Sequence, residues 1–119
     1  MASTFGTNSW YLNSGCSRHM TGDKGQFINL KPKSGGEVSF VDNSKELIKG
    51  IGSICKNSSI FIEHVLYVNG LKHNLLSISQ LYDKGLNVIF ESNGCKIIDI
   101  ASNNIMLVGH RIGNIYIVH

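Results

Sequence analysis

The chain has 119 residues, of which 42% are apolar and 16% charged, and its formal net charge is +3. This is the length of one domain, and the chain is too hydrophobic and too weakly charged to be disordered. No apolar run reaches the roughly 18 residues that a membrane-spanning helix needs, and no signal peptide is expected. The mild positive charge does not by itself indicate a nucleic-acid partner.

The composition favours an all-β fold. Fifteen isoleucines suit the pleated, half-buried surface of a sheet, and thirteen glycines with a single proline supply tight turns. The three cysteines, Cys16, Cys55 and Cys95, are widely spaced and form neither a disulfide framework nor a zinc pattern, which fits a reducing compartment. We expect one domain over residues 1–119, with residues 1–9 as a flexible N-terminal segment.

Short apolar or alternating runs, separated by polar turns, predict the strands in chain order. They are expected at Trp10–Leu12, Gln26–Leu30, Val38–Phe40, Leu47–Ile51, Ser59–Val68, Leu86–Phe90, Cys95–Ile100, Ile105–Val108 and Asn114–Val118. The third and fourth runs flank the polar turn Asp42–Lys45 and therefore predict a hairpin. Apolar residues at helical spacing predict one short helix over Leu71–Tyr82, with Gly85 at its end.

The most informative local feature is the polar triplet Asn13-Ser14-Gly15, which follows the apolar run Trp10–Leu12. Aspartic proteases present their catalytic loop in this way, with a carboxylate first, a hydroxyl second and glycine third. Two such carboxylates about 3 Å apart share one proton, so that one activates water while the other donates to the scissile carbonyl. A chain with one triplet needs a second copy, related by a two-fold axis, to complete the pair. Taken alone, the triplet is more typical of a plain turn.

Several further segments, in the same order along the chain, resemble the protease segment of Ty1/copia-type retrotransposon polyproteins. They are Asn13–Gly22 (NSGCSRHMTG), Val41–Lys45, Ile48–Gly52, Val65–Val68, Gly70–Leu81 (GLKHNLLSISQL) and Gly109–Tyr116. The resemblance extends from Trp10 to the end of the chain, and it is specific because several separate motifs occur in the right order.

The resemblance implies a retropepsin-like fold, that is, a small closed β-barrel with a flap hairpin and one short α-helix, active as a homodimer. The flap would be the hairpin between Val38 and Ile51. Its substrate-binding residues would be Val41, Asp42, Asn43, Ser44 and Lys45. His73 and Asn74 would brace the catalytic loop and the dimer, although Asn74 could instead be the N-cap of the helix.

The resemblance also implies an aspartic endopeptidase that cleaves the Gag-Pol polyprotein. The substrate would lie extended and pair its backbone with the flap and the cleft walls. The partners implied are therefore a second copy of the chain and a polypeptide substrate, with no membrane and no nucleic acid. No metal or organic cofactor is implied, and the implied location is the cytoplasm, within virus-like particles.

One departure from the family pattern affects the chemistry. The family has Asp where this chain has Asn13, and an amide can neither hold the shared proton nor act as a general base. Ser14 would still brace the loop and Gly15 would still allow close approach of the backbone. The sequence therefore predicts the protease in an inactive form, and the intact surrounding motif favours a deliberate substitution over a natural inactive enzyme. The alternative is a non-catalytic β-barrel module that binds a peptide or a partner domain.

Other uses of the same side chains are weaker hypotheses. Ser14 beside His19 lacks the elbow of a serine nucleophile. A metal site from Cys16 and His19 with Cys55 and His64 has unsuitable spacing, so we expect a small buried cysteine and a surface histidine. Cys16 as a nucleophile is no better supported. Six lysines are scattered rather than striped, which gives no support for a nucleic-acid surface: Lys31, Lys33, Lys45, Lys49, Lys56 and Lys72.

Overall fold

The fold is that of a computed structural model of the chain, which describes residues 9–33, 35–39, 45–56 and 60–119. Strands dominate the described chain, together with one short 3-10 helix (η1) and one short α-helix. In chain order the elements are β1 (Trp10–Asn13), β2 (Met20–Thr21), η1 (Lys24–Gln26), β3 (Phe27–Pro32), β4 (Glu37–Ser39), β5 (Lys45–Lys56), β6 (Ile60–Val68), β7 (Asn74–Ser77), α1 (Ile78–Asp83), β8 (Leu86–Glu91), β9 (Gly94–Asp99), β10 (Ile105–Ile112) and β11 (Ile115–Val118). None of the described helices is long and apolar enough to cross a membrane.

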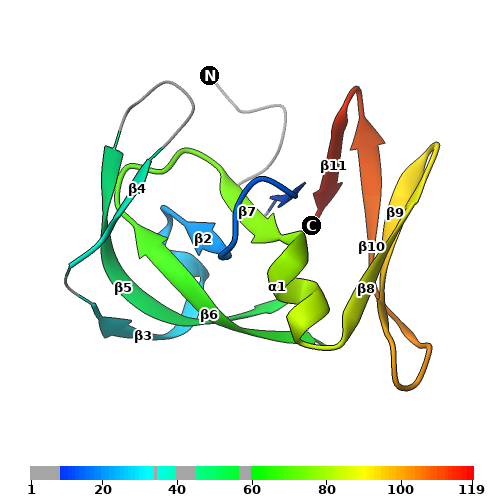
Figure 1. The fold of residues 1–119 in the computed structure, drawn as a ribbon, viewed down its shortest axis with the longest axis horizontal. Helices are drawn as coiled ribbons and strands as arrows, with labels where there is room; N and C mark the ends of the chain where they lie inside the picture. The colour runs from blue at the N-terminus through cyan, green and yellow to red at the C-terminus, as the bar shows by residue number, and fades with distance from the viewer. Residues whose placement is uncertain (1–8, 34, 40–44, 57–59) are drawn as a thin grey trace.

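The strands form one strongly curved sheet. Its hydrogen-bonded order is β3-β5-β6-β2-β7-β1-β11-β10-β9-β8, and β4 pairs with β5 beside this path. In Figure 1, β3 to β6 lie on one side of the molecule and β8 to β11 on the other, with β7 and α1 between them. Near the middle of the path, β1 pairs in parallel with β7 and antiparallel with β11.

The predicted all-β class is confirmed, but the sheet is not closed. Among the described residues, the pairing path starts at β3 and ends at β8 without a ladder between these two strands. The resemblance implies a closed barrel, so the open path is a difference from that expectation. Curvature nevertheless lets the two sides of the sheet share one core, in which Ile54 and Ile62 from β5 and β6 join Trp10 of β1 and Ile97 of β9.

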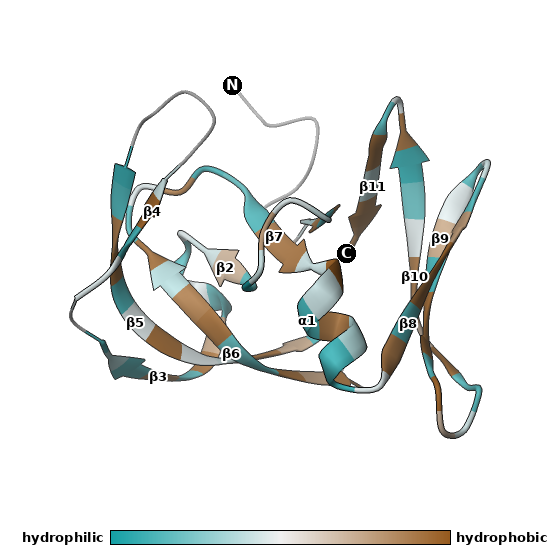
Figure 2. Ribbon diagram, viewed as in Figure 1, coloured by the Kyte–Doolittle hydropathy of each residue, from teal (hydrophilic) through white to brown (hydrophobic). Residues whose placement is uncertain are grey.

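The abundance of isoleucine, valine and aromatic residues explains why most of the predicted strands form. The longest antiparallel pair, β5 with β6, runs from Ile48↔Val68 to Lys56↔Ile60. Figure 2 shows β6 as apolar at both ends with a polar stretch between them, which in the sequence is Glu63-His64. The C-terminal meander β8–β11 forms as predicted, except that β10 continues to Ile112, so that the last turn begins at Gly113.

The helix predicted over Leu71–Tyr82 is wrong in its first half. Residues Asn74–Ser77 form β7, and only Ile78–Asp83 are α-helical. Parallel pairing with β1, through the register Leu12↔Leu76, holds this stretch extended, so tertiary structure overrides the helical spacing. Gly85 follows the helix with φ +80°, and its N–H donates to the carbonyl of Tyr82 at 3.0 Å, as the sequence predicts for the end of the helix.

The end of β2 approaches the connection between β6 and β7 very closely at Gly22. A Cβ atom at this position would lie 2.1 Å from the carbonyl oxygen of Leu71, which is backbone and cannot turn aside. We therefore expect Gly22→Ala to lower the free energy of unfolding by about 3 kcal/mol in urea denaturation. Gly25→Ala is the matched control, because its Cβ would meet only the side chain of Asp23, at 3.2 Å. Equal stability of the two variants would contradict this packing.

Candidate active site

The triplet Asn13-Ser14-Gly15 lies at the end of β1, where the parallel pairing with β7 also ends. Asn13 is the last strand residue and pairs with Ser77, while Ser14 and Gly15 follow in an exposed bend. Trp10, at the start of the strand, is fully buried in the core. A strand anchored in the core by Trp10 therefore carries the triplet to the surface.

The Asn13 side chain shapes the loop by an Asx turn. Its Oδ1 accepts a hydrogen bond from the backbone N–H of Gly15 at 2.6 Å. A Cβ on Gly15 would lie 3.1 Å from the same oxygen, so a side chain there would require a small adjustment of the turn. A carboxylate at position 13 could keep this bond with one oxygen and present the other where the amide nitrogen now lies. The local geometry is therefore compatible with aspartate.

Ser77 ties the loop to the first turn of α1. Its Oγ donates to the carbonyl of Cys16 at 2.8 Å, just after the triplet, and accepts from the backbone N–H of Gln80 at 3.2 Å as the N-cap of the helix. The Gln80 Oε1 in turn accepts from the backbone N–H of His19 at 2.8 Å. Ser77 and Gln80 were missed in the sequence analysis, although a serine followed by glutamine three positions later is a helix-start signal.

His19 is buried behind the loop, with 1% of its surface exposed. The prediction that it lies on the surface is therefore wrong. Its Nδ1 accepts a hydrogen bond from the backbone N–H of Ser77 at 2.9 Å. Burial, and then the neighbouring positive charge of Arg18, lower the pKa of His19 from 6.5 to about 4. The ring is therefore neutral near pH 7 and carries its proton on Nε2.

Asn74 is a structural brace but not the N-cap of the helix. It is buried at the start of β7, where its Oδ1 accepts from the Oγ1 of Thr21 at 2.6 Å and its Nδ2 donates to the carbonyl of Ser9 at 3.0 Å. Its neighbour His73 is exposed and stacks on the ring of Tyr11 in β1, with centroids 4.8 Å apart. Both residues thus hold β1 and β2 in place, while their role in a dimer stays a prediction.

The hairpin predicted as the flap forms from β4 and β5, with Val38 opposite Glu46 and Ser39 opposite Lys45. Of the predicted substrate-binding residues, Val41, Asp42, Asn43 and Ser44 lie outside the described residues. Lys45 is the first residue of β5, and its Nζ lies 3.5 Å from a carboxylate oxygen of Glu37 in an exposed ion pair. A hairpin at this place is confirmed, and its function as a flap stays a prediction.

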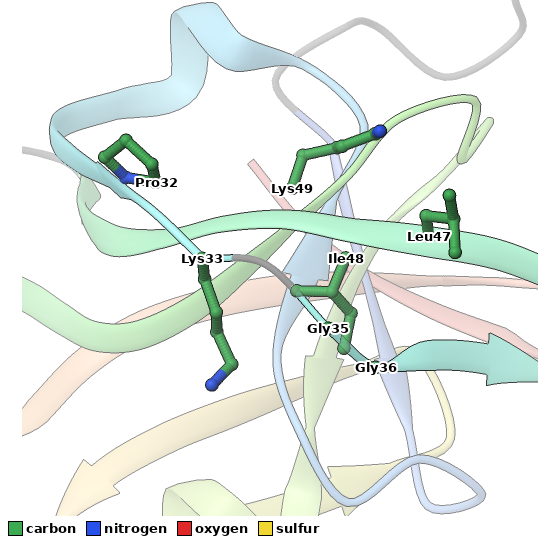
Figure 3. A pocket seen from close by; sticks show the side chains of 7 residues that line it. All are labelled: Pro32, Lys33, Gly35, Gly36, Leu47, Ile48 and Lys49. Atoms are coloured by element: carbon green, nitrogen blue, oxygen red, sulfur yellow. The ribbon is translucent and has the colours of Figure 1, made fainter.

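A cavity of about 340 Å³ lies at the base of this hairpin. It is lined by Pro32, Lys33, Gly35, Gly36, Leu47, Ile48 and Lys49. Figure 3 shows the ammonium groups of Lys33 and Lys49 pointing away from each other, so they do not converge on one anion. The cavity therefore gives no independent evidence for a phosphate or nucleic-acid site.

The geometry does not support a metal site or a cysteine nucleophile, the two alternatives considered for these side chains. The described part of the chain brings no three His, Cys, Asp or Glu side chains together in a way that could hold a metal ion. Cys55 is exposed, whereas Cys16 is half-buried, and burial raises the pKa of the Cys16 thiol, which disfavours the nucleophilic thiolate. The exposed triplet above its hydrogen-bonded support remains the candidate site.

Comparison with known proteins agrees with this reading of the fold. Residues 10–86 match the family described as Pol polyprotein, beta-barrel domain, and the chain belongs to this family. It is 27% identical over 121 aligned positions to the retrovirus-related Pol polyprotein from transposon RE1 of Arabidopsis thaliana, covering 98% of this chain and 8% of the relative. It is 32% identical over 83 positions to that from transposon RE2 of the same plant, covering 66% of this chain and 6% of the relative.

These comparisons define a domain and not a whole protein. The chain spans less than a tenth of the length of either relative, so the activities of a complete Pol polyprotein are not transferred to it. No solved structure matches the chain.

Proposed function

We propose that the chain is the aspartic endopeptidase domain of a retrotransposon Pol polyprotein, in a form that Asn13 makes inactive. The observation that carries this proposal is the exposed Asx turn Asn13–Gly15 at the end of the parallel strand pair of β1 and β7. An aspartate there could keep the turn and leave one carboxylate oxygen free for a partner carboxylate or water. The substrate is an extended polypeptide, and the polyprotein itself is the natural candidate.

The proposal requires a second copy, because one triplet provides half of a two-carboxylate site. We expect a two-fold homodimer with Asn13, Ser14 and Gly15 near the axis. Two neutral amides do not repel each other as two carboxylates do, so the dimer of this chain should be at least as strong as that of an Asn13→Asp variant.

Sedimentation equilibrium over a range of concentrations measures this assembly. Asn93→Asp, in the exposed turn between β8 and β9, is the matched control, because it adds the same charge far along the chain from the triplet. It should leave the dimer constant unchanged. A chain that remains monomeric at high concentration, with residue 13 open to solvent, contradicts the proposal and favours the alternative of a non-catalytic binding module. Cleavage by the Asn13→Asp variant tests the chemistry directly.

A further inference from the structure

A second cavity lies away from the triplet, between β6, α1 and β8. Its volume is about 310 Å³, and none of the loop residues Asn13–Gly15 lines it. The lining residues are His19, Ile60, Phe61, Ile62, Glu63, Leu81, Lys84, Leu86 and Met106. We call it the His19 cavity, because the only imidazole in its lining belongs to that residue.

The Nε2–H group of His19 points into this cavity. The Nδ1 atom is already occupied by the N–H of Ser77, so the proton of the neutral ring is on Nε2. Among the described residues, no other protein group makes a hydrogen bond with Nε2, and no fully buried side-chain nitrogen or oxygen lacks a partner. Since His19 lines the cavity and is otherwise buried, its small exposed part is this N–H group. The cavity thus contains one preorganised donor.

The rest of the cavity has a mixed lining of apolar and polar surface, with one charge of each sign. Ile62 and Leu81 are buried, whereas Leu86 and Met106 are half-buried, so these last two residues supply the aliphatic part of the wall. Glu63 and Lys84 are exposed members of the lining with opposite charges, which favours neither an anion nor a cation. The donor, the mixed wall and the opposite charges together fit a small neutral ligand that combines a short alkyl group with a hydrogen-bond acceptor.

We propose that the His19 cavity binds a branched aliphatic amide, whose carbonyl oxygen accepts from the Nε2–H of His19 while its alkyl group packs against Leu86 and Met106. This chemistry occurs both in small free amides and in a leucine residue of a polypeptide. His19 lies two hydrogen bonds from Cys16, the residue that follows the triplet, because Ser77 bonds to both of them. The proposal does not depend on protease activity.

Nuclear magnetic resonance of the chain with ¹⁵N-labelled histidine tests the proposal. Isovaleramide represents the free amide, and N-acetyl-leucine N-methylamide represents a polypeptide segment. We expect at least one of them to shift the His19 Nε2 resonance saturably. The amide that binds more strongly shows whether the ligand is a small free amide or a leucine residue of a polypeptide. Isopentylammonium, which has the same branched chain but no acceptor, should bind at least about tenfold more weakly.

Two variants on β8 locate the binding. Leu86→Phe places a larger side chain in the lining of the cavity, whereas Ile89→Phe changes an exposed residue of the same strand that does not line it. The first should weaken binding about tenfold or more, and the second less than about twofold. Absence of a saturable shift with either amide in the unmodified chain overturns the proposal. Equal binding to both variants, or equally strong binding of isopentylammonium, also overturns it.

Discussion

Replacing Asn13 by Asp is expected to turn the chain into a peptidase. The amide Oδ1 already holds the Asx turn to Gly15, and the substitution exchanges an amide nitrogen for an oxygen of similar size, so the loop should keep its shape. In the proposed dimer, two carboxylates would then share a proton and supply the general acid and base. We expect the cleavage rate of a polyprotein fragment to rise about a thousandfold or more over that of the Asn13 chain.

The pH dependence of the Asn13→Asp variant should be bell-shaped and highest on the acidic side of neutral, where the pair of carboxylates holds one proton. A mimic of the transition state with a hydroxyl at the scissile carbon should inhibit it, whereas a metal chelator should not. The control Asn93→Asp should show no gain in cleavage. A folded, dimeric Asn13→Asp variant that cuts nothing between acidic and neutral pH would refute the protease proposal.

Acid is expected to destabilise the fold through His19. The folded chain binds a proton at this ring only at a pKa of about 4, whereas the unfolded chain binds it near the ordinary value of 6.5. Between these values the unfolded state holds more protons, so the free energy of unfolding falls as the pH falls from 6.5 to 4. The full effect is about 3 kcal/mol. The stability is present above pH 6.5 and is lost on acidification.

Urea denaturation at a series of pH values measures this effect. His110→Gln is the matched control, because it replaces an exposed histidine by the same residue. His19→Gln should be less stable than the unmodified chain at pH 7, since the ring bonded to Ser77 is lost, and should lose less stability on acidification. An acid dependence that is the same with and without His19 would contradict the buried, neutral ring. Circular dichroism separates such unfolding from the acidic limb of the activity profile.

The strands and the turns between them could be predicted because their signals are local. Short runs rich in isoleucine and valine mark strands such as β6, and polar residues with glycine mark the turns between them. The turn at Asn13–Gly15 was predictable from its residue types, and its role as a catalytic loop stays a prediction. The hairpin of β4 and β5 followed from two short runs around a polar turn.

The errors arise where contacts distant in sequence decide the conformation. Leu71 and Leu75 pack in a smaller cluster around Met20, while Leu76 and Leu81 enter the main core, so the leucines of this region do not share one helix face. The partner that holds Leu76 in a strand is Leu12 of β1, and nothing local identifies it.

The burial of polar side chains could not be predicted from the sequence either. The burial of His19 depends on Ser77, 58 residues away, and the sequence pattern gives no sign of that contact. Lys56 belongs to the set of scattered lysines, yet it is only 5% exposed and its Nζ lies 5.9 Å from the centre of the Trp10 ring. Burial lowers the pKa of Lys56 to about 8.

A mixing experiment tests the central claim most directly, namely that two copies of this chain build one site from their residues 13. The Asn13→Asp variant is kept at a fixed concentration at which it is fully dimeric, and the unmodified chain is added and allowed to exchange. If both carboxylates are required, activity should fall to about one half at equal amounts and to about one quarter at threefold excess, because mixed dimers carry a single carboxylate. Activity that stays constant as the unmodified chain is added, while mixed dimers form, would show that one chain suffices and would contradict the account.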